Sequence, residues 1–203
     1  MKKGLAVIAG LVLLFTMSGC NHPSQSEMEQ TLAAFTDALK AYDKEEMAAL
    51  LTEFPDNSAY VYYDDIFNDD GYVEMYRVLY PGITYAVQSA NQNQLVAVFT
   101  MPNIQTLYAN ITALVLQMVL EDAELQNKLA EDDANGSVLV RKMMLAYAKQ
   151  GYEIEQMTQT LTLTFEKEDG QTVLRCDDEV RELITGNFFL SKNSTQAEIN
   201  SAA

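Results

Sequence analysis

The chain has 203 residues, and its 29 acidic side chains outnumber its 13 lysines and arginines, which gives a formal net charge of −16. We expect no nucleic-acid partner, because phosphate binding depends on clustered basic side chains that this composition does not supply. Two cysteines cannot build a disulfide framework, so an apolar core must hold the fold together.

The first twenty residues have the pattern of an export signal. Two lysines precede an apolar run over residues 5–15, which is shorter than the about 20 apolar residues that a membrane-spanning helix needs. Small residues and Cys20 follow, and this segment resembles a bacterial lipoprotein signal. The resemblance implies that residues 1–19 are removed and that Cys20 carries a diacylglyceryl lipid. That lipid would anchor the protein to the extracytoplasmic face of the cell membrane.

Residues 20–25 are then expected to be the lipidated cysteine and a polar tether, followed by a single domain over residues 26–190. A capping box at Ser26 and Glu29 predicts the start of a first helix, in which apolar residues recur with helical spacing up to Tyr42. Asp43 begins a second helix that Pro55 ends, and residues 72–80 form a third. Residues 191–203 are expected to be a disordered tail.

Strands are predicted over residues 83–88 and 95–101, with a turn at residues 91–94. The second strand is uniformly apolar, which indicates a central position in the sheet. Asn103 caps a long helix that is expected to continue to Leu129. Its stretch Ile111–Leu120 is apolar on nearly all sides, which we interpret as deep burial. A further helix ends at Gly151.

The last strand pair has a register that the sequence predicts. Thr residues alternate with apolar residues up to Phe165, and Asp169-Gly170 is a strong hairpin turn. Pairing Glu168 with Gln171 across this turn places Phe165 opposite Leu174 and Leu163 opposite Cys176. Cys176 is therefore expected to be a buried, unreactive thiol. An aspartate at 177 or 178 caps a final helix that ends at Gly186.

These elements predict an α+β fold in which N-terminal helices pack on a curved antiparallel sheet, with a helical insertion over residues 103–150 between the two strand pairs. The segments 29–35, 161–170 and 177–184 resemble small bacterial extracytoplasmic lipoproteins of the nuclear transport factor 2-like (cystatin-like) superfamily. The resemblance implies a cone-shaped domain with a space between sheet and helices. It leaves function open, because this superfamily spans enzymes, binding modules and scaffolds.

The function predicted is a non-catalytic module that binds a small molecule or a protein, with no cofactor, no catalytic residue and no metal site. Among the tyrosines and methionines that could line a contact face, three tyrosines beside two aspartates are the least core-like, and these five residues form the candidate binding surface: Tyr60, Tyr62, Tyr63, Asp64 and Asp65. A module of this kind predicts a cavity of at least about 300 Å³. A purely structural envelope scaffold, the first alternative, predicts a filled core and a large exposed apolar patch.

Two kinds of chemistry compete with this interpretation. A ketosteroid isomerase-like enzyme would use a pocket carboxylate and a tyrosine, for which the candidates are Asp37 with Tyr85, Tyr147 or Tyr152. Calcium binding would need an EF-hand loop. Alignment on Gly71 or Gly136 instead places Arg77 or Lys142 where the bidentate glutamate belongs, so neither loop fits. Weak divalent binding to the acidic cluster Asp64–Asp70 stays as an alternative to the favoured interpretation, a solvated acidic loop.

Overall fold

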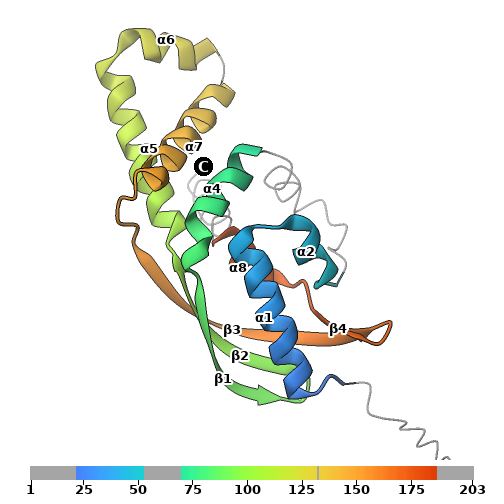
Figure 1. Cartoon of the computed structure of the whole chain (residues 1–203). Helices are drawn as coiled ribbons and strands as arrows, with labels where there is room; N and C mark the ends of the chain where they lie inside the picture. Colours follow the sequence, from blue (N-terminus) through green and yellow to red (C-terminus); the bar gives the residue numbers. More distant parts are fainter. Residues whose placement is uncertain (1–21, 53–69, 132, 187–203) are drawn as a thin grey trace, which may run out of the picture.

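The computed structural model describes residues 22–52, 70–131 and 133–186 (Figure 1). The predicted signal peptide, the lipidation site Cys20 and the predicted tail lie outside the described residues. The elements follow in the order α1 (Gln25–Ala41), α2 (Lys44–Ala49), α4 (Asp70–Leu79), η2 (Tyr80–Gly82), β1 (Thr84–Asn91), β2 (Gln94–Pro102), α5 (Ile104–Glu121), α6 (Ala123–Glu131), α7 (Asp133–Lys149), β3 (Gln156–Glu168), β4 (Gln171–Leu174) and α8 (Asp178–Thr185).

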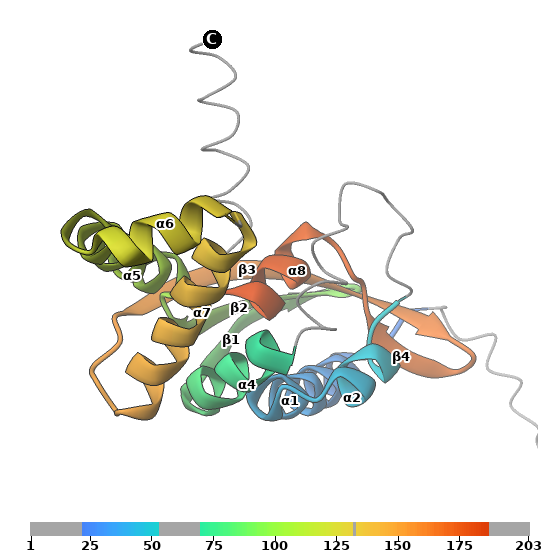
Figure 2. The same ribbon diagram turned by 90° about the horizontal axis from the view of Figure 1, so that it is seen from above.

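The four strands form one antiparallel sheet in the order β1-β2-β3-β4. Helices α1, α4 and α8 cover one face of this curved sheet, and α5, α6 and α7 project beyond it as an arm (Figures 1 and 2). The arm lies in the chain between the two strand pairs. The α+β prediction, with a helical insertion at this place, is therefore confirmed, as is the central position of the second strand.

The space between sheet and helices contains closely packed side chains. The sheet contributes alternate residues of β2 and β3, and α1 faces them with the apolar stripe that the sequence predicts. All of these side chains are at most 2% exposed: Leu32, Phe35, Leu39, Leu95, Ala97, Phe99, Leu161, Leu163 and Phe165. This is the core that must hold the fold without disulfides.

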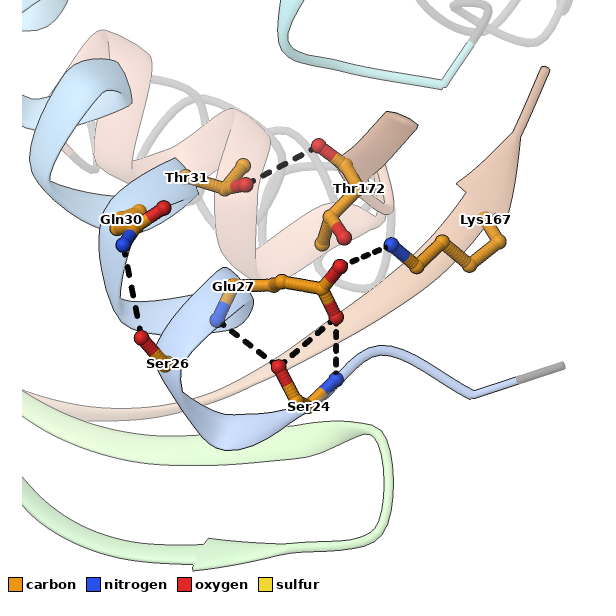
Figure 3. Close-up of polar contacts among 7 residues, drawn as sticks. All are labelled: Ser24, Ser26, Glu27, Gln30, Thr31, Lys167 and Thr172. Carbon is orange, nitrogen blue, oxygen red and sulfur yellow. Dashed lines mark hydrogen bonds and ion pairs between the residues drawn. The ribbon is translucent and has the colours of Figure 1, made fainter. Parts of the chain in front are cut away.

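Helix α1 begins two residues earlier than the sequence predicts. The capping box is formed by Ser24 and Glu27 rather than by Ser26 and Glu29 (Figure 3). Both serines have a glutamate at the required spacing, but only Glu27 can also bind β3, where Lys167 Nζ lies 2.6 Å from Glu27 Oε1. This second contact selects the earlier cap. It fixes the first turn of the domain to the sheet and shortens the predicted tether.

The hairpin β3–β4 has the predicted register at Phe165–Leu174 and at Glu168–Gln171. The ladder ends at Leu174, however, so the predicted pair Leu163–Cys176 does not form. The chain after α2 displaces it: Leu50 O accepts from Leu174 N–H at 2.8 Å, and Thr52 Oγ1 accepts from Cys176 N–H at 2.9 Å. The second helix accordingly ends at Ala49, earlier than predicted. Cys176 is buried as expected, and burial raises the pKa of its thiol.

Three buried tyrosines join the helices above the sheet. The ring of Tyr42, at the end of α1, stacks on that of Tyr76 with centroids 4.6 Å apart, and Tyr80 packs edge-on against both rings. Tyr76 Oη donates to Thr185 O at 2.9 Å, and Tyr80 Oη donates to Ile184 O at 3.0 Å. These hydroxyls satisfy carbonyls at the end of α8 that have no partner within the helix.

Gly186 joins this cluster to the arm. Its φ of 63° is left-handed, and a Cβ placed there would lie 2.5 Å from Cγ1 of Ile104, the first residue of α5. We predict that Gly186→Ala destabilises the domain by roughly 1–3 kcal/mol, because both the backbone and the packing resist a methyl group. The matched control is Gly136→Ala in α7, where nothing lies within 4 Å. This change should be neutral or stabilise by about 0.5–1 kcal/mol in urea unfolding. Equal effects of the two substitutions would contradict this account.

The Glu27 cap predicts a pH dependence. The hydrogen bond from Lys167, followed by those from the Ser24 backbone and hydroxyl, lowers the pKa of the Glu27 carboxyl to about 2. A lowered folded-state pKa stabilises the fold above the unfolded pKa of about 4.3, and this stabilisation is lost as the pH falls toward 2. The stability difference between the wild type and Glu27→Gln, measured by urea unfolding, should therefore shrink over this range. Lys167→Gln should remove most of the trend, and a difference independent of pH would contradict it.

Candidate interaction surface

The arm is fixed to the sheet at the first residue before α5. Asn103 caps the helix, since its side chain accepts from Thr106 N–H at 3.0 Å, and its own backbone N–H donates to Glu155 O at 2.8 Å. Pro102 ends β2 directly before this cap. The start of α5 is thereby held against the segment that leads into β3, and the predicted cap is confirmed.

The inner face of α5 packs against α7. Four residues of α5 with helical spacing are buried, and α7 contributes three buried side chains to the same core: Ile104, Leu107, Ile111 and Val115, with Val140, Met144 and Ala148. On its other side α7 is joined to α4, because Lys149 pairs with Glu74 and the guanidinium of Arg141 lies 4.9 Å from the ring centroid of Tyr72. Through α7, the arm is thus braced against the rest of the domain.

The opposite side of α5 is apolar and exposed. The expectation of deep burial for Ile111–Leu120 holds for Ile111 and Val115 but is wrong for four other side chains of the stretch, because Leu114 is 44% exposed, Leu116 59%, Met118 40% and Leu120 81%. Of the six large hydrophobic side chains that are exposed in the described ranges, four lie on this helix. We call the side opposite the buried stripe the α5 outer face, and its apolar members are Ala109, Ala113, Leu116 and Leu120. Leu114 and Met118, each three residues after a buried residue, lie at the border of the inner face.

No charged residue interrupts the outer face. The sequence contains no Asp, Glu, Lys or Arg from Val78 to Leu120, although the whole chain has a net charge of −16. Exposed helix surfaces ordinarily carry charges, and a contiguous apolar patch on a soluble domain marks an interaction site. The part of this run that lies in α5 is a signal that the sequence offered, and it makes the outer face the candidate interaction surface.

Asp122 ends α5 and divides the long helix that the sequence predicts. Its backbone N–H donates to Met118 O, while its side chain accepts from Glu124 N–H at 2.9 Å and from Leu125 N–H at 3.1 Å, so it caps α6. An aspartate favours this role because its short side chain competes for backbone donors. The exposed leucines therefore lie on α5, before the break at Asp122.

The tyrosine–aspartate surface predicted at Tyr60, Tyr62, Tyr63, Asp64 and Asp65 lies outside the described residues. A binding space was expected between sheet and helices. Three buried side chains lie in that region: Tyr42, Tyr76 and Tyr80. Among the described residues, no group of three or more His, Cys, Asp and Glu side chains is placed to hold a metal ion.

The residues that a ketosteroid isomerase-like enzyme would use, Asp37 with Tyr85, Tyr147 or Tyr152, differ from one another in their surroundings. The Asp37 side chain is 80% exposed and lies 3.8 Å from Lys40 Nζ. Tyr85 stacks on Phe99, and burial, followed by the charges of Asp37 and Glu29, raises the pKa of its hydroxyl. A raised pKa makes this tyrosine a poorer proton donor. Tyr147 and Tyr152 contact each other, with ring centroids 4.7 Å apart.

Within the described part of the chain, we find no helix with the length and apolar character required to cross a membrane.

Comparison with known proteins identifies no family. No family model matches the chain, and a search of curated proteins finds no match. Among solved structures, the crystal structure of a candidate lipoprotein, YcdA of Bacillus subtilis, is similar with a TM-score of 0.39 and 14% sequence identity. The alignment covers 77% of this chain and 54% of that one. A likeness this distant supports no conclusion about fold or activity, so function must be inferred from the molecule itself.

Proposed function

We propose that this protein is a non-catalytic, lipid-anchored binding module on the extracytoplasmic side of the membrane, and that it binds protein through the α5 outer face. The observation that carries the proposal is the exposure of Leu116 and Leu120 on one side of α5, a helix with no charged residue before Glu121, in a strongly acidic protein. Interface cores are depleted in charge in the same way.

The energetics favour a covered outer face. Burying one leucine side chain contributes about 1.5–3 kcal/mol, and Leu116 and Leu120 are the two most exposed apolar side chains of the described arm. A protein partner suits this surface better than a small molecule does, because small ligands bind in concave pockets that enclose them. The packed tyrosines and phenylalanines between sheet and helices support the same choice. A structural envelope scaffold is the second candidate, since a filled core and an exposed apolar patch are also what it requires.

The position of the arm fits an anchored protein. The first described turn begins at Ser24, four residues beyond Cys20, and Figure 1 shows the start of α1 and the arm at opposite ends of the molecule. A lipid on Cys20 would place the outer face at the end of the domain distant from the anchor. The acidic domain would also be repelled by an anionic bilayer. An antiparallel sheet covered on one face by α1, α4 and α8 is compatible with the nuclear transport factor 2-like superfamily, which we propose as its fold family.

Site-specific photocrosslinking of the full chain in membranes tests this proposal. A photoreactive amino acid at Leu116 or Leu120 should give protein adducts, whereas the same group at Thr160, which is exposed on β3, should give none. In the same cells Cys20→Ser should move the protein from the membrane to the soluble fraction. Equal labelling at all three positions would overturn the binding face, and undiminished membrane retention of Cys20→Ser would overturn the anchor.

A further inference from the structure

The α5 outer face needs a specific occupant, and the apolar stretch that directly follows α8 is too close to Gly186 to reach its most exposed leucines. Its apolar stretch Phe188–Leu190 begins two residues after Gly186, which lies against Ile104 at the start of α5. Four extended residues span about 13 Å at roughly 3.3 Å each. Along the helix, Leu116 and Leu120 lie about 18 and 24 Å from Ile104, at 1.5 Å per residue. This stretch can therefore contact the first half of the outer face but not its most exposed leucines.

The outer face has a symmetric pattern of small and large residues. Ala109, Ala113, Leu116 and Leu120 are spaced four, three and four residues apart, so all four lie on one stripe of the helix. The stripe is opposite the buried positions that pack on α7. Its two small residues come first and its two large residues second, and the spacing reads the same in both directions about the midpoint between Leu114 and Val115.

We propose that the occupant of the outer face is a second copy of this chain, with the two α5 helices packed antiparallel about a two-fold axis at that midpoint. This inference rests on the proposed function, since it names the protein that binds the same face. In this arrangement Ala109 faces Leu120 of the second copy, and Ala113 faces its Leu116. Each exposed leucine enters the space beside an alanine, which is the self-complementarity that a two-fold interface requires.

The charges at the two ends of α5 favour the antiparallel direction. The helix has no acidic residue in its first turn and no basic residue in its last, so its own dipole is uncompensated at both ends. Antiparallel pairing about the midpoint keeps the Glu121 carboxylates of the two copies at opposite ends of the contact and sets the two helix dipoles in opposite directions. Parallel pairing would instead bring these carboxylates together. Between the ends the stripe is uncharged, so two acidic chains meet there without like charges in contact.

The contact is small. Helix α5 has 18 residues and is about 27 Å long, and one helix pair buries less than the about 800 Å² per partner of a standard stable interface. The expected dimer is therefore weak and needs a test that traps it in place. Antiparallel helices 8–10 Å apart bring facing Cα atoms within the reach of a disulfide, which ends near 7 Å.

Paired cysteine crosslinking in membranes tests the register directly. Two differently tagged full chains are expressed together, one with Ala113→Cys and the other with Leu116→Cys, and a second pair carries Ala109→Cys and Leu120→Cys. Both pairs should crosslink several-fold more under mild oxidation than the mismatched pair Ala109→Cys with Leu116→Cys, whose positions are displaced by about 6 Å along the helices. All four sites are exposed, so the domain should fold normally, and Cys176 is buried and can remain.

The outcomes separate this inference from the proposed function. The dimer is supported if only the matched pairs crosslink. An added Ala113→Leu should then reduce crosslinking between Ala109→Cys and Leu120→Cys, because the new side chain fills the space for Leu116. Equal yields from matched and mismatched pairs overturn it. If photoadducts at Leu116 then contain another protein, the binding module stands and only its partner is different. If Leu116 gives no protein adduct at all, both proposals fail.

Discussion

The junction at Gly186 is the constraint on which the rest of the molecule depends. There the end of α8, the hydroxyl of Tyr80 and the first residue of α5 occupy a space that admits no side chain on the glycine. Tyr76 and Tyr80 satisfy the last carbonyls of α8, and their rings stack with Tyr42 at the end of α1. This one cluster of buried contacts thus sets the positions of the N-terminal helix, the C-terminal helix and the start of the arm.

A fixed root determines which side of α5 can be buried. Asn103 and Ile104 direct the helix along α7, and α7 is itself held by α4, so only the inner face of α5 meets the core. Nothing in the described chain covers the other side to the same extent, and Leu116 and Leu120 remain exposed there. The arm therefore joins the core through α7 and the inner face of α5, and the outer face of α5 stays outside that packing. Its apolar outer face is the basis of the binding role that we propose.

Local patterns predicted the parts of the fold that local chemistry decides. Asp169 and Gly170 both adopt positive φ, so the turn set the register of β3 on β4, and Asn103 and Gly186 cap helices where their residue types require it. Contacts between distant segments were not predictable in this way. The true cap at Ser24 is selected by Lys167, and β4 is shortened by Thr52. An apolar helix likewise reveals its composition but not whether another element covers it, which is why burial of α5 was wrongly expected.

The central claim is that the two sides of α5 differ, one belonging to the core and the other to an interface. The measurement that tests it most directly is the free energy of unfolding of Ile111→Ala and Leu116→Gln at low protein concentration. Ile111 is 4% exposed, so its truncation should cost about 2–4 kcal/mol, whereas Leu116→Gln should change stability by less than about 0.5 kcal/mol. A loss at Leu116 as large as that at Ile111 would show that the outer face is part of the core, and would contradict the account.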